Sequence, residues 1–109
     1  MVVMYNNKLL ANQVAIADTF NKRLKGLLGK SSINIEEGLL LKNCSSIHCF
    51  FMRFTIDAVY LSENMTVIEK ETIKPWKIGK IVKNTIHVLE LKEGASQDVK
   101  IGDTLLFKE

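Results

Sequence analysis

Short runs of apolar and β-branched residues recur along this chain and predict many short strands. The first run, Val2 to Tyr5, ends at Asn6-Asn7, a pair that is typical of hairpin turns. The run Lys8 to Ala17 follows as a second predicted strand. Further strands are predicted over residues 39–41, 56–61, 66–73, 85–91 and 104–107. Many closely spaced strands are typical of a mainly β fold, here a small antiparallel β-barrel or a rolled sheet.

One stretch of the chain changes to the period of a helix. Its apolar positions recur at i, i+4, i+7 and i+8, namely Phe20, Leu24, Leu27 and Leu28. Thr19 can cap the start of this helix, and Gly29 would end it. Because Gly26 weakens the pattern, we expect one short helix over about residues 19–29.

The run Ile56 to Leu61, IDAVYL, is mainly apolar on both faces. Side chains alternate along a strand, so Ala58 and Tyr60 would face one way and Val59 the other. Such a strand is expected where one face packs inside a rolled sheet and the other lies beneath a helix or loop. No repeat, low-complexity tract or change of composition divides the chain, so we expect one domain over residues 1–109.

Composition limits the classes of protein to which the chain can belong. With 47% hydrophobic and 25% charged residues it is typical of globular proteins. No apolar run approaches a membrane span, so we expect no membrane partner. The first residues lack the features of a signal peptide, which makes a cytoplasmic location the expectation. A net charge of +3 is too small to imply nucleic acid, and we expect a monomer or a weak homo-oligomer.

Both cysteines and one of the two histidines lie in the stretch CSSIHCFFMRF, residues 44–54. On an extended strand the α-carbons of Cys44 and Cys49 would be about 16 Å apart, against about 4.4–6.8 Å in a disulfide, unless the segment folds back tightly. Structural zinc needs four ligands, and the adjacent His48 and Cys49 would point to opposite faces of the strand. Cys44 and His48 would be about 13 Å apart, beyond hydrogen-bond reach unless a turn brings them closer. We therefore predict no metal and no cofactor, and interpret the cysteines as buried residues rather than nucleophiles.

Two carboxylates interrupt apolar strands. Asp57 lies within IDAVYL, and Glu90 lies between two leucines. A buried carboxylate is costly unless it is paired or hydrogen-bonded, and Arg23 and Arg53, the only arginines, would suit such pairing. One interpretation is a structural ion pair, or an Asp57 that accepts backbone N–H groups at a turn. The other is a functional pocket, rimmed by His48, Met52, Arg53, Asp57 and Glu90.

The segment KPWKIGKIVK, residues 74–83, places a lysine at every third position and contains no acidic residue. Lysines beside Trp76 can hold a phosphorylated ligand or a single-stranded base. The alternative is a solvated lysine face on which Trp76 covers the open end of the barrel. We favour this second interpretation, because nucleic-acid modules tend to carry a stronger net charge, and we regard nucleic acid as an unlikely partner.

Six of these segments, in order, resemble the DUF192 family, a widespread set of small bacterial and archaeal domains of unknown function. The matching segments are RLKGLLGK, GLLL, CSSIHCFFMRFTIDAVYL, Lys-Pro-Trp-Lys at 74–77, HVLELKEG and IGD, which span Arg23 to Asp103. The positions that match the family's pattern are Arg23, Gly26, His48, Met52, Asp57, Pro75, Glu90, Gly94, Gly102 and Asp103. Cys44 stands where related sequences often carry cysteine, whereas Cys49 replaces a more typical threonine, which counts against a role that needs both sulfurs. The resemblance implies a small, mostly antiparallel β-barrel with a short helix, and no established activity.

We interpret the chain as a binding module rather than an enzyme. Its partly polar pocket would hold either a small molecule or a segment of a partner protein. An anionic small molecule is among the ligands that we consider. The ligand-binding candidates are Arg23, His48, Met52, Arg53, Asp57, Trp76, Lys77 and Glu90. One alternative is an enzyme in which Asp57 or Glu90 is the general base, His48 is the acid and Arg53 orients an anionic substrate. Another is a structural or protein-interaction domain, for which an exposed apolar patch would be the sign.

Overall fold

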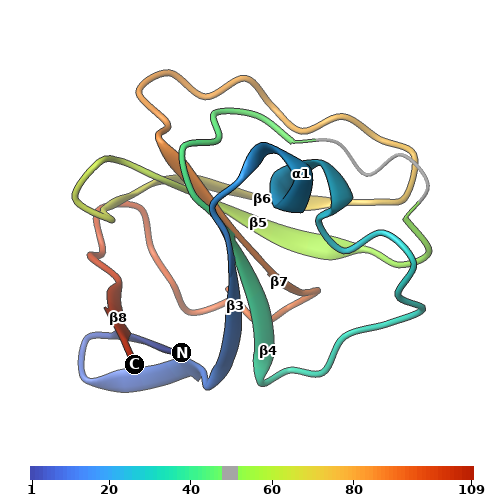
Figure 1. Ribbon diagram of the computed structural model, residues 1–109. Helices are drawn as coiled ribbons and strands as arrows, with labels where there is room; N and C mark the ends of the chain where they lie inside the picture. The colour runs from blue at the N-terminus through green and yellow to red at the C-terminus, as the bar shows by residue number, and fades with distance from the viewer. Residues whose placement is uncertain (48–51) are drawn as a thin grey trace.

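The computed structural model describes residues 1–47 and 52–109, and within them the protein is mainly β (Figure 1). The strands are β1 (Val2–Tyr5), β2 (Lys8–Ala11), β3 (Gln13–Ala17), β4 (Glu37–Leu41), β5 (Ile56–Leu61), β6 (Val67–Ile73), β7 (His87–Lys92) and β8 (Leu106–Lys108). They form a three-stranded sheet, β2-β1-β8, and a five-stranded sheet, β3-β4-β7-β5-β6. Within these sheets the pairing is antiparallel except between β3 and β4, which are parallel. The predicted mainly β fold is confirmed, and the described strands form two sheets rather than a closed barrel.

The run from Lys8 to Ala17, predicted as one strand, is divided between the two sheets. Strand β2 ends and β3 begins on either side of Asn12, which is exposed. The backbone N–H groups of Asn12 and Gln13 both donate to the carbonyl oxygen of Glu36, at 3.0 and 2.9 Å. These bonds turn the chain out of the small sheet and start the parallel pairing of β3 with β4, which the sequence pattern does not show.

A single short helix, α1 (Phe20–Lys25), is found in the described residues, and it connects β3 to the segment before β4. It begins as predicted at Thr19, whose side chain accepts a hydrogen bond from the backbone N–H of Lys22 at 3.2 Å. It ends at Gly26 and not at Gly29, because Gly26 takes a positive φ of 50° while its N–H still bonds to the carbonyl of Lys22. The predicted helix was therefore about one turn too long.

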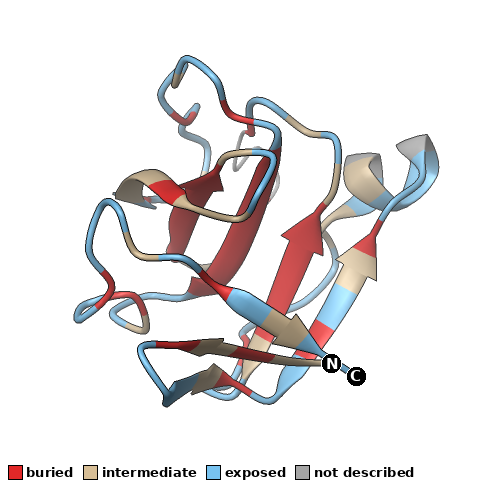
Figure 2. Ribbon diagram, turned by 90° about the vertical axis from the view of Figure 1, so that its left-hand side faces the viewer, coloured by how far each residue is buried: buried red, intermediate tan, exposed pale blue. Residues whose placement is uncertain are grey.

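The central strands β5 and β7 are buried on both faces, as the pattern of IDAVYL predicted (Figure 2). The face toward α1 carries Ile56, Ala58, Tyr60 and Val88. The face toward the three-stranded sheet carries Val59, Leu61, Leu89 and Leu91. Each face forms its own apolar cluster, so a polar side chain on β5 or β7 is buried whichever way it points.

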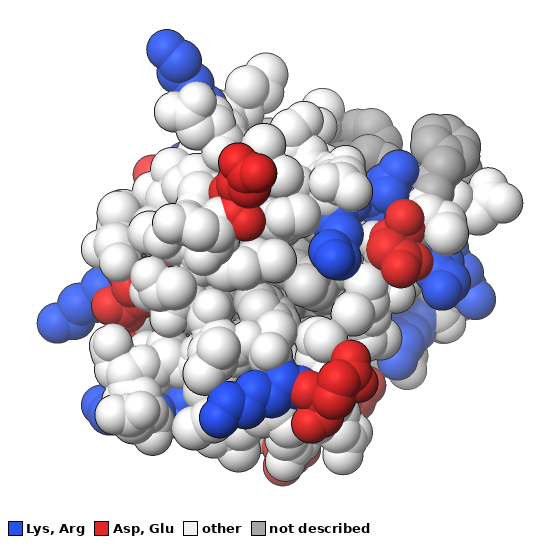
Figure 3. All heavy atoms as spheres, turned by 60° about the vertical axis from the view of Figure 1, so that its left-hand side comes forward, with Lys and Arg blue, Asp and Glu red and all other residues white. Residues whose placement is uncertain are grey.

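The connection between β6 and β7 is long and runs along the upper outline of the molecule in Figure 1, in light orange. On the face drawn in Figure 3, acidic and basic side chains both occur, with wide uncharged areas between them. In the part of the chain that the structure describes, no helix is long and apolar enough to cross a membrane.

Candidate functional site

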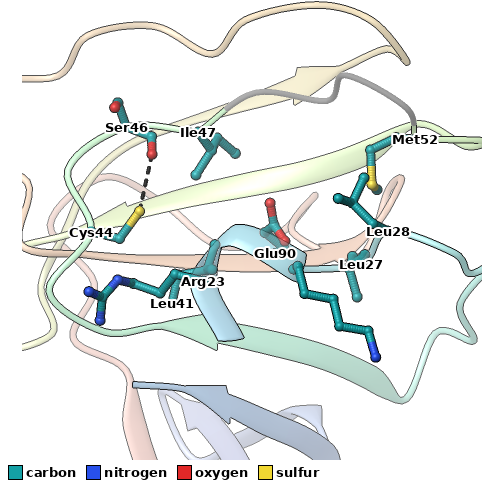
Figure 4. Close-up of a pocket in the computed structure, with 11 residues that line it drawn as sticks. Arg23, Leu27, Leu28, Leu41, Cys44, Ser46, Ile47, Met52 and Glu90 are labelled. Atoms are coloured by element: carbon teal, nitrogen blue, oxygen red, sulfur yellow. Dashed lines mark hydrogen bonds between the residues drawn. The ribbon is translucent and has the colours of Figure 1, made fainter. Parts of the chain in front are cut away.

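A pocket of about 210 Å³ opens on the face of the five-stranded sheet that α1 covers (Figure 4). Its walls come from α1 and the residues after it, from β4 and β7, and from residues 44–47 and 52. Most of the wall is apolar and consists of Leu27, Leu28, Leu41, Ile47 and Met52. The polar lining residues are Arg23, Lys25, Cys44, Ser46 and Glu90. A mainly apolar wall with a few polar groups is typical of sites that bind small molecules.

Glu90 brings a carboxylate to this apolar pocket. It lies on β7 opposite Ala58 of β5, so the alternation of the strand turns it toward α1 while Leu89 and Leu91 face the other sheet. The residue is only 5% exposed, and no hydrogen bond or ion pair within the described residues reaches its carboxylate. Burial away from water raises the pKa of the Glu90 carboxyl to about 7. Close to neutral pH this group therefore exists both as an acid and as a carboxylate.

The turn that ends α1 lies over the Glu90 carboxylate. An ideal Cβ placed on Gly26 would be 4.0 Å from Oε1 of Glu90 and 3.6 Å from the carbonyl oxygen of Arg23. Gly26 also holds the positive φ that ends the helix. A residue with a side chain at this position would be strained and would occupy space next to the carboxylate.

Arg23 lines the same pocket but does not neutralise Glu90. Its Nη1 donates to the backbone carbonyl of Lys42 at 3.2 Å, and in Figure 4 its guanidinium extends away from the Glu90 carboxylate. The salt bridges between described residues, Lys22–Asp18 and Lys30–Glu37, involve neither arginine. The ion-pair interpretation of the two strand carboxylates is therefore not supported for Arg23.

Asp57 belongs to a different environment, on the opposite face of the sheet. It pairs in register with Leu91, one residue beyond Glu90, and so points toward the three-stranded sheet. Its Oδ2 accepts from the backbone N–H and the hydroxyl of Ser96, at 3.0 and 2.6 Å, and its Oδ1 accepts from Thr72 at 3.0 Å. These three bonds satisfy the buried carboxylate, as in the turn interpretation. The expectation that Asp57 and Glu90 share one pocket is wrong, because their side chains leave opposite faces of adjacent strands.

Cys44 lines the pocket as a neutral thiol. Its Sγ donates to the carbonyl oxygen of Ser46 at 3.1 Å (Figure 4). Burial is the main cause that raises the pKa of the Cys44 thiol above its usual value, and the negative charge of Glu90 acts in the same direction. Both effects disfavour the thiolate. Among the residues that the structure describes, no group of three or more His, Cys, Asp or Glu is placed to hold a metal ion.

The structure brings together three of the predicted site residues, Arg23, Met52 and Glu90. His48 lies outside the described residues, as does Cys49. The exposed residues Arg53, Trp76 and Lys77 do not line this pocket. Sequence reasoning missed Lys25, Leu27, Leu28, Leu41, Cys44, Ser46 and Ile47 as lining residues. A signal was available for Cys44, Ser46 and Ile47, which stand in the same segment, residues 44–54, as Met52.

Residues 25–28 also form one wall of a second and larger pocket, of about 510 Å³, between the turn after α1 and the strands β3 and β4. Two of its basic side chains, Lys22 and Lys30, are engaged in the salt bridges with Asp18 and Glu37, and the third, Lys25, also lines the pocket of Glu90. We therefore regard the pocket of Glu90 as the stronger candidate site.

Comparison with family models gives a match to DUF192, described as "Uncharacterized ACR, COG1430", over residues 1–107. The chain belongs to the DUF192 family. One similar DUF192 relative is UPF0127 protein PH1112 of Pyrococcus horikoshii, which is 33% identical over 81% of this chain and 79% of the relative. Another is UPF0127 protein PF1050 of Pyrococcus furiosus, which is 27% identical over 96% of this chain and 95% of the relative. Their names report no activity.

Two solved structures share the fold of this DUF192 chain. A protein of unknown function from Novosphingobium aromaticivorans superposes with a TM-score of 0.82 over 98% of this chain and 84% of that one, at 17% identity. A putative transcription regulator from Sinorhizobium meliloti superposes with a TM-score of 0.75 over 85% and 79%, at 20% identity. At these identities the likeness supports the fold alone.

Proposed function

We propose that this DUF192 protein is a binding module that holds a small molecule in the pocket of Glu90. The observation that carries the proposal is the buried Glu90 carboxylate, which has no partner among the described residues and points into a mainly apolar pocket. Buried polar groups are almost always hydrogen-bonded, so a carboxylate that receives no hydrogen bond from the described residues needs a further partner. A ligand bound in the pocket would supply it.

The pocket itself indicates what such a ligand carries. A cavity of about 150 Å³ can hold benzene, so the 210 Å³ here suits a molecule of about ten non-hydrogen atoms. The leucines, Ile47 and Met52 favour an apolar body, and Glu90 favours a hydrogen-bond donor such as an amine at the inner end. An anionic group, which the sequence led us to consider, would be repelled by Glu90 and suits only the side of the pocket near Arg23 and Lys25.

The test is a thermal-shift screen of small amines and neutral hydrogen-bond donors, followed by calorimetric titration. A ligand of the native state must raise its melting temperature. Glu90→Gln and Glu90→Leu are expected to lose the shift, whereas Glu93→Gln, an exposed position just beyond β7, is the matched control and keeps it. For an amine, affinity should rise roughly tenfold per pH unit up to about pH 7 as Glu90 ionises, and this slope should disappear in Glu90→Gln.

Two results would contradict the proposal. One is a screen in which no compound stabilises the wild-type protein. The other is a set of ligands that shift both Glu90 variants as much as the wild type, since the carboxylate would then take no part in binding.

A second candidate function is acid–base catalysis by Glu90. The observation that favours it is the pKa of about 7, which lies where a general acid or base is most effective. Asp57 takes no part in this version, since it lies on the other face of the sheet. Exchange of carbon-bound protons of a bound ligand in D₂O, followed by NMR, would distinguish the two. Exchange that is lost in Glu90→Gln while binding persists would support catalysis.

A further inference from the structure

Residues 74–83, between β6 and β7, expose an unusual amount of apolar surface. The exposed fractions of Trp76, Ile78 and Ile81 are 57%, 68% and 93%. Eight large hydrophobic residues are exposed in the described part of the chain, and these three fall within six consecutive positions. Single exposed hydrophobic residues are ordinary, but such a group marks a surface that binds something.

Trp76 is presented on a turn whose backbone disfavours it. The N–H of Lys77 donates to the carbonyl of Lys74 at 3.2 Å, with Pro75 and Trp76 as the two central residues. Trp76 has a positive φ of 68°, as the third residue of a type II turn requires, and glycine or asparagine is usual at that position. Four of the six non-glycine residues with positive φ in the described chain are asparagines, and Trp76 is by far the bulkiest of the six. Strain of this kind is characteristic of functional positions.

The rest of the segment is held firmly on the body of the protein. The buried Gly79 donates its N–H to the carbonyl of Ile47 at 2.9 Å, and the N–H of Lys80 donates to Oε2 of Glu71 at 2.7 Å. Val82 packs against the core on the same side as α1. These hydrogen bonds fix the backbone of the segment against the rest of the protein. Ile78 and Ile81 are therefore exposed because of where the fold places the segment.

The charged side chains of the segment itself all have one sign, although the Glu71 carboxylate of β6 lies against the backbone of Lys80. Lys74, Lys77, Lys80 and Lys83 are all exposed, and no acidic residue lies between them in the sequence. Exposed isoleucines and tryptophan flanked by lysines combine the two features by which peripheral proteins bind anionic membranes: insertion of apolar side chains and attraction to lipid headgroups.

We propose that residues 74–83 dock the protein onto an anionic lipid surface, independently of the Glu90 pocket. Charge complementarity selects an anionic partner, and a lipid bilayer accepts protruding apolar side chains without a groove of matching shape. Nucleic acid fits less well, because Trp76 alone could stack on a base, whereas Ile78 and Ile81, which are more exposed, offer bases no stacking surface. The sequence alone led us to expect no membrane partner and a solvated lysine face. The exposure of both isoleucines and the conformation of Trp76 are the new observations.

The test uses the intact chain and vesicles of phosphatidylcholine, alone or mixed equally with phosphatidylglycerol. Trp76 is the only tryptophan of the chain, so its fluorescence reports on this segment directly. We expect co-sedimentation with the anionic vesicles, a blue shift of the emission and quenching by brominated lipids, with much weaker effects on neutral vesicles. Raising the salt concentration should weaken binding.

Variants locate the surface. Ile78→Ser with Ile81→Ser, and separately Lys80→Gln with Lys83→Gln, are each expected to weaken vesicle binding on the order of tenfold or more. Ile101→Ser and Lys100→Gln change exposed residues elsewhere and should leave it unchanged. The proposal is overturned if emission and sedimentation are the same with and without anionic vesicles at low salt, or if the loop variants bind like the wild type. A blue shift with polyglutamate but not with vesicles would also overturn it, in favour of an acidic protein partner.

Discussion

Replacing Glu90 with glutamine should change the way in which the stability of the protein depends on pH. The carboxyl has a pKa of 4.5 in an unfolded chain and about 7 in the folded protein, because burial disfavours its charged form. Between these values the folded state holds more protons than the unfolded state, so stability falls as the pH rises. The contribution of Glu90 is complete below about pH 4.5 and is lost as the pH rises through about 7.

The size of the effect follows from the difference between the two pKa values. A shift from 4.5 to about 7 corresponds to a free energy of about 3 kcal/mol, at 1.36 kcal/mol per unit. Glutamine has nearly the same shape and cannot ionise. The unfolding free energy of Glu90→Gln minus that of the wild type should therefore increase by about 3 kcal/mol between pH 4.5 and pH 8.

The assay is urea unfolding of both proteins at a series of pH values, followed by circular dichroism. Taking the difference between the two curves cancels the titration of all other groups. Glu93→Gln, exposed beyond the end of the same strand, should give a flat difference curve. A flat curve for Glu90→Gln as well would refute the reasoning, since it would mean that water reaches the carboxylate and that Glu90 is not desolvated. The titration of the Glu90 side-chain carboxyl carbon by NMR is an independent check.

Four further changes test other parts of the structure. Burial lowers the pKa of His87, so its own contribution to stability is lost as the pH drops below about 6.5, and the unfolding free energy of His87→Asn minus that of the wild type should rise over that range. Asp57→Asn should destabilise by about 1–3 kcal/mol in urea unfolding, because one of its three donors then faces an amide nitrogen. Gly79→Ala would place a Cβ 2.5 Å from the Tyr60 hydroxyl and should cost about 1–3 kcal/mol, less in a Tyr60→Phe background if that contact is the cause. Trp76→Gly removes a bulky side chain from a position of positive φ and should weaken vesicle binding, read out by co-sedimentation because the variant lacks the tryptophan.

Much of the fold is readable from local pattern, because local physics decides it. The hairpin at Asn6-Asn7 follows from residues that accept positive φ, and the start of α1 follows from the cap at Thr19. The end of α1 was misplaced because two glycines compete for it, and the choice of Gly26 depends on the packing of the turn over β7. The break at Asn12 depends on the carbonyl of Glu36, which lies far along the chain and leaves no mark in the local pattern.

The residues of the candidate site could not be predicted without the tertiary structure, for a different reason. Arg23, Met52 and Glu90 come from three separated segments, and the alternation of a strand gives only the relative direction of side chains within that strand. Whether a residue on β5 and a residue on β7 share a face depends on the register between the strands. The register pairs Ala58 with Glu90 and so turns Asp57 the other way.

The two buried carboxylates show why burial alone does not identify a functional residue. In the sequence, Asp57 and Glu90 look alike, since each interrupts an apolar strand. In the structure, Asp57 accepts three hydrogen bonds and ties β5 and β6 to the turn at Ser96, so its charge is matched within the fold. Glu90 receives no hydrogen bond from the described residues and keeps an open pocket in front of it. A fold selected for stability alone would gain by replacing Glu90 with an apolar residue, and this difference from Asp57 is why the proposed ligand site is centred on Glu90.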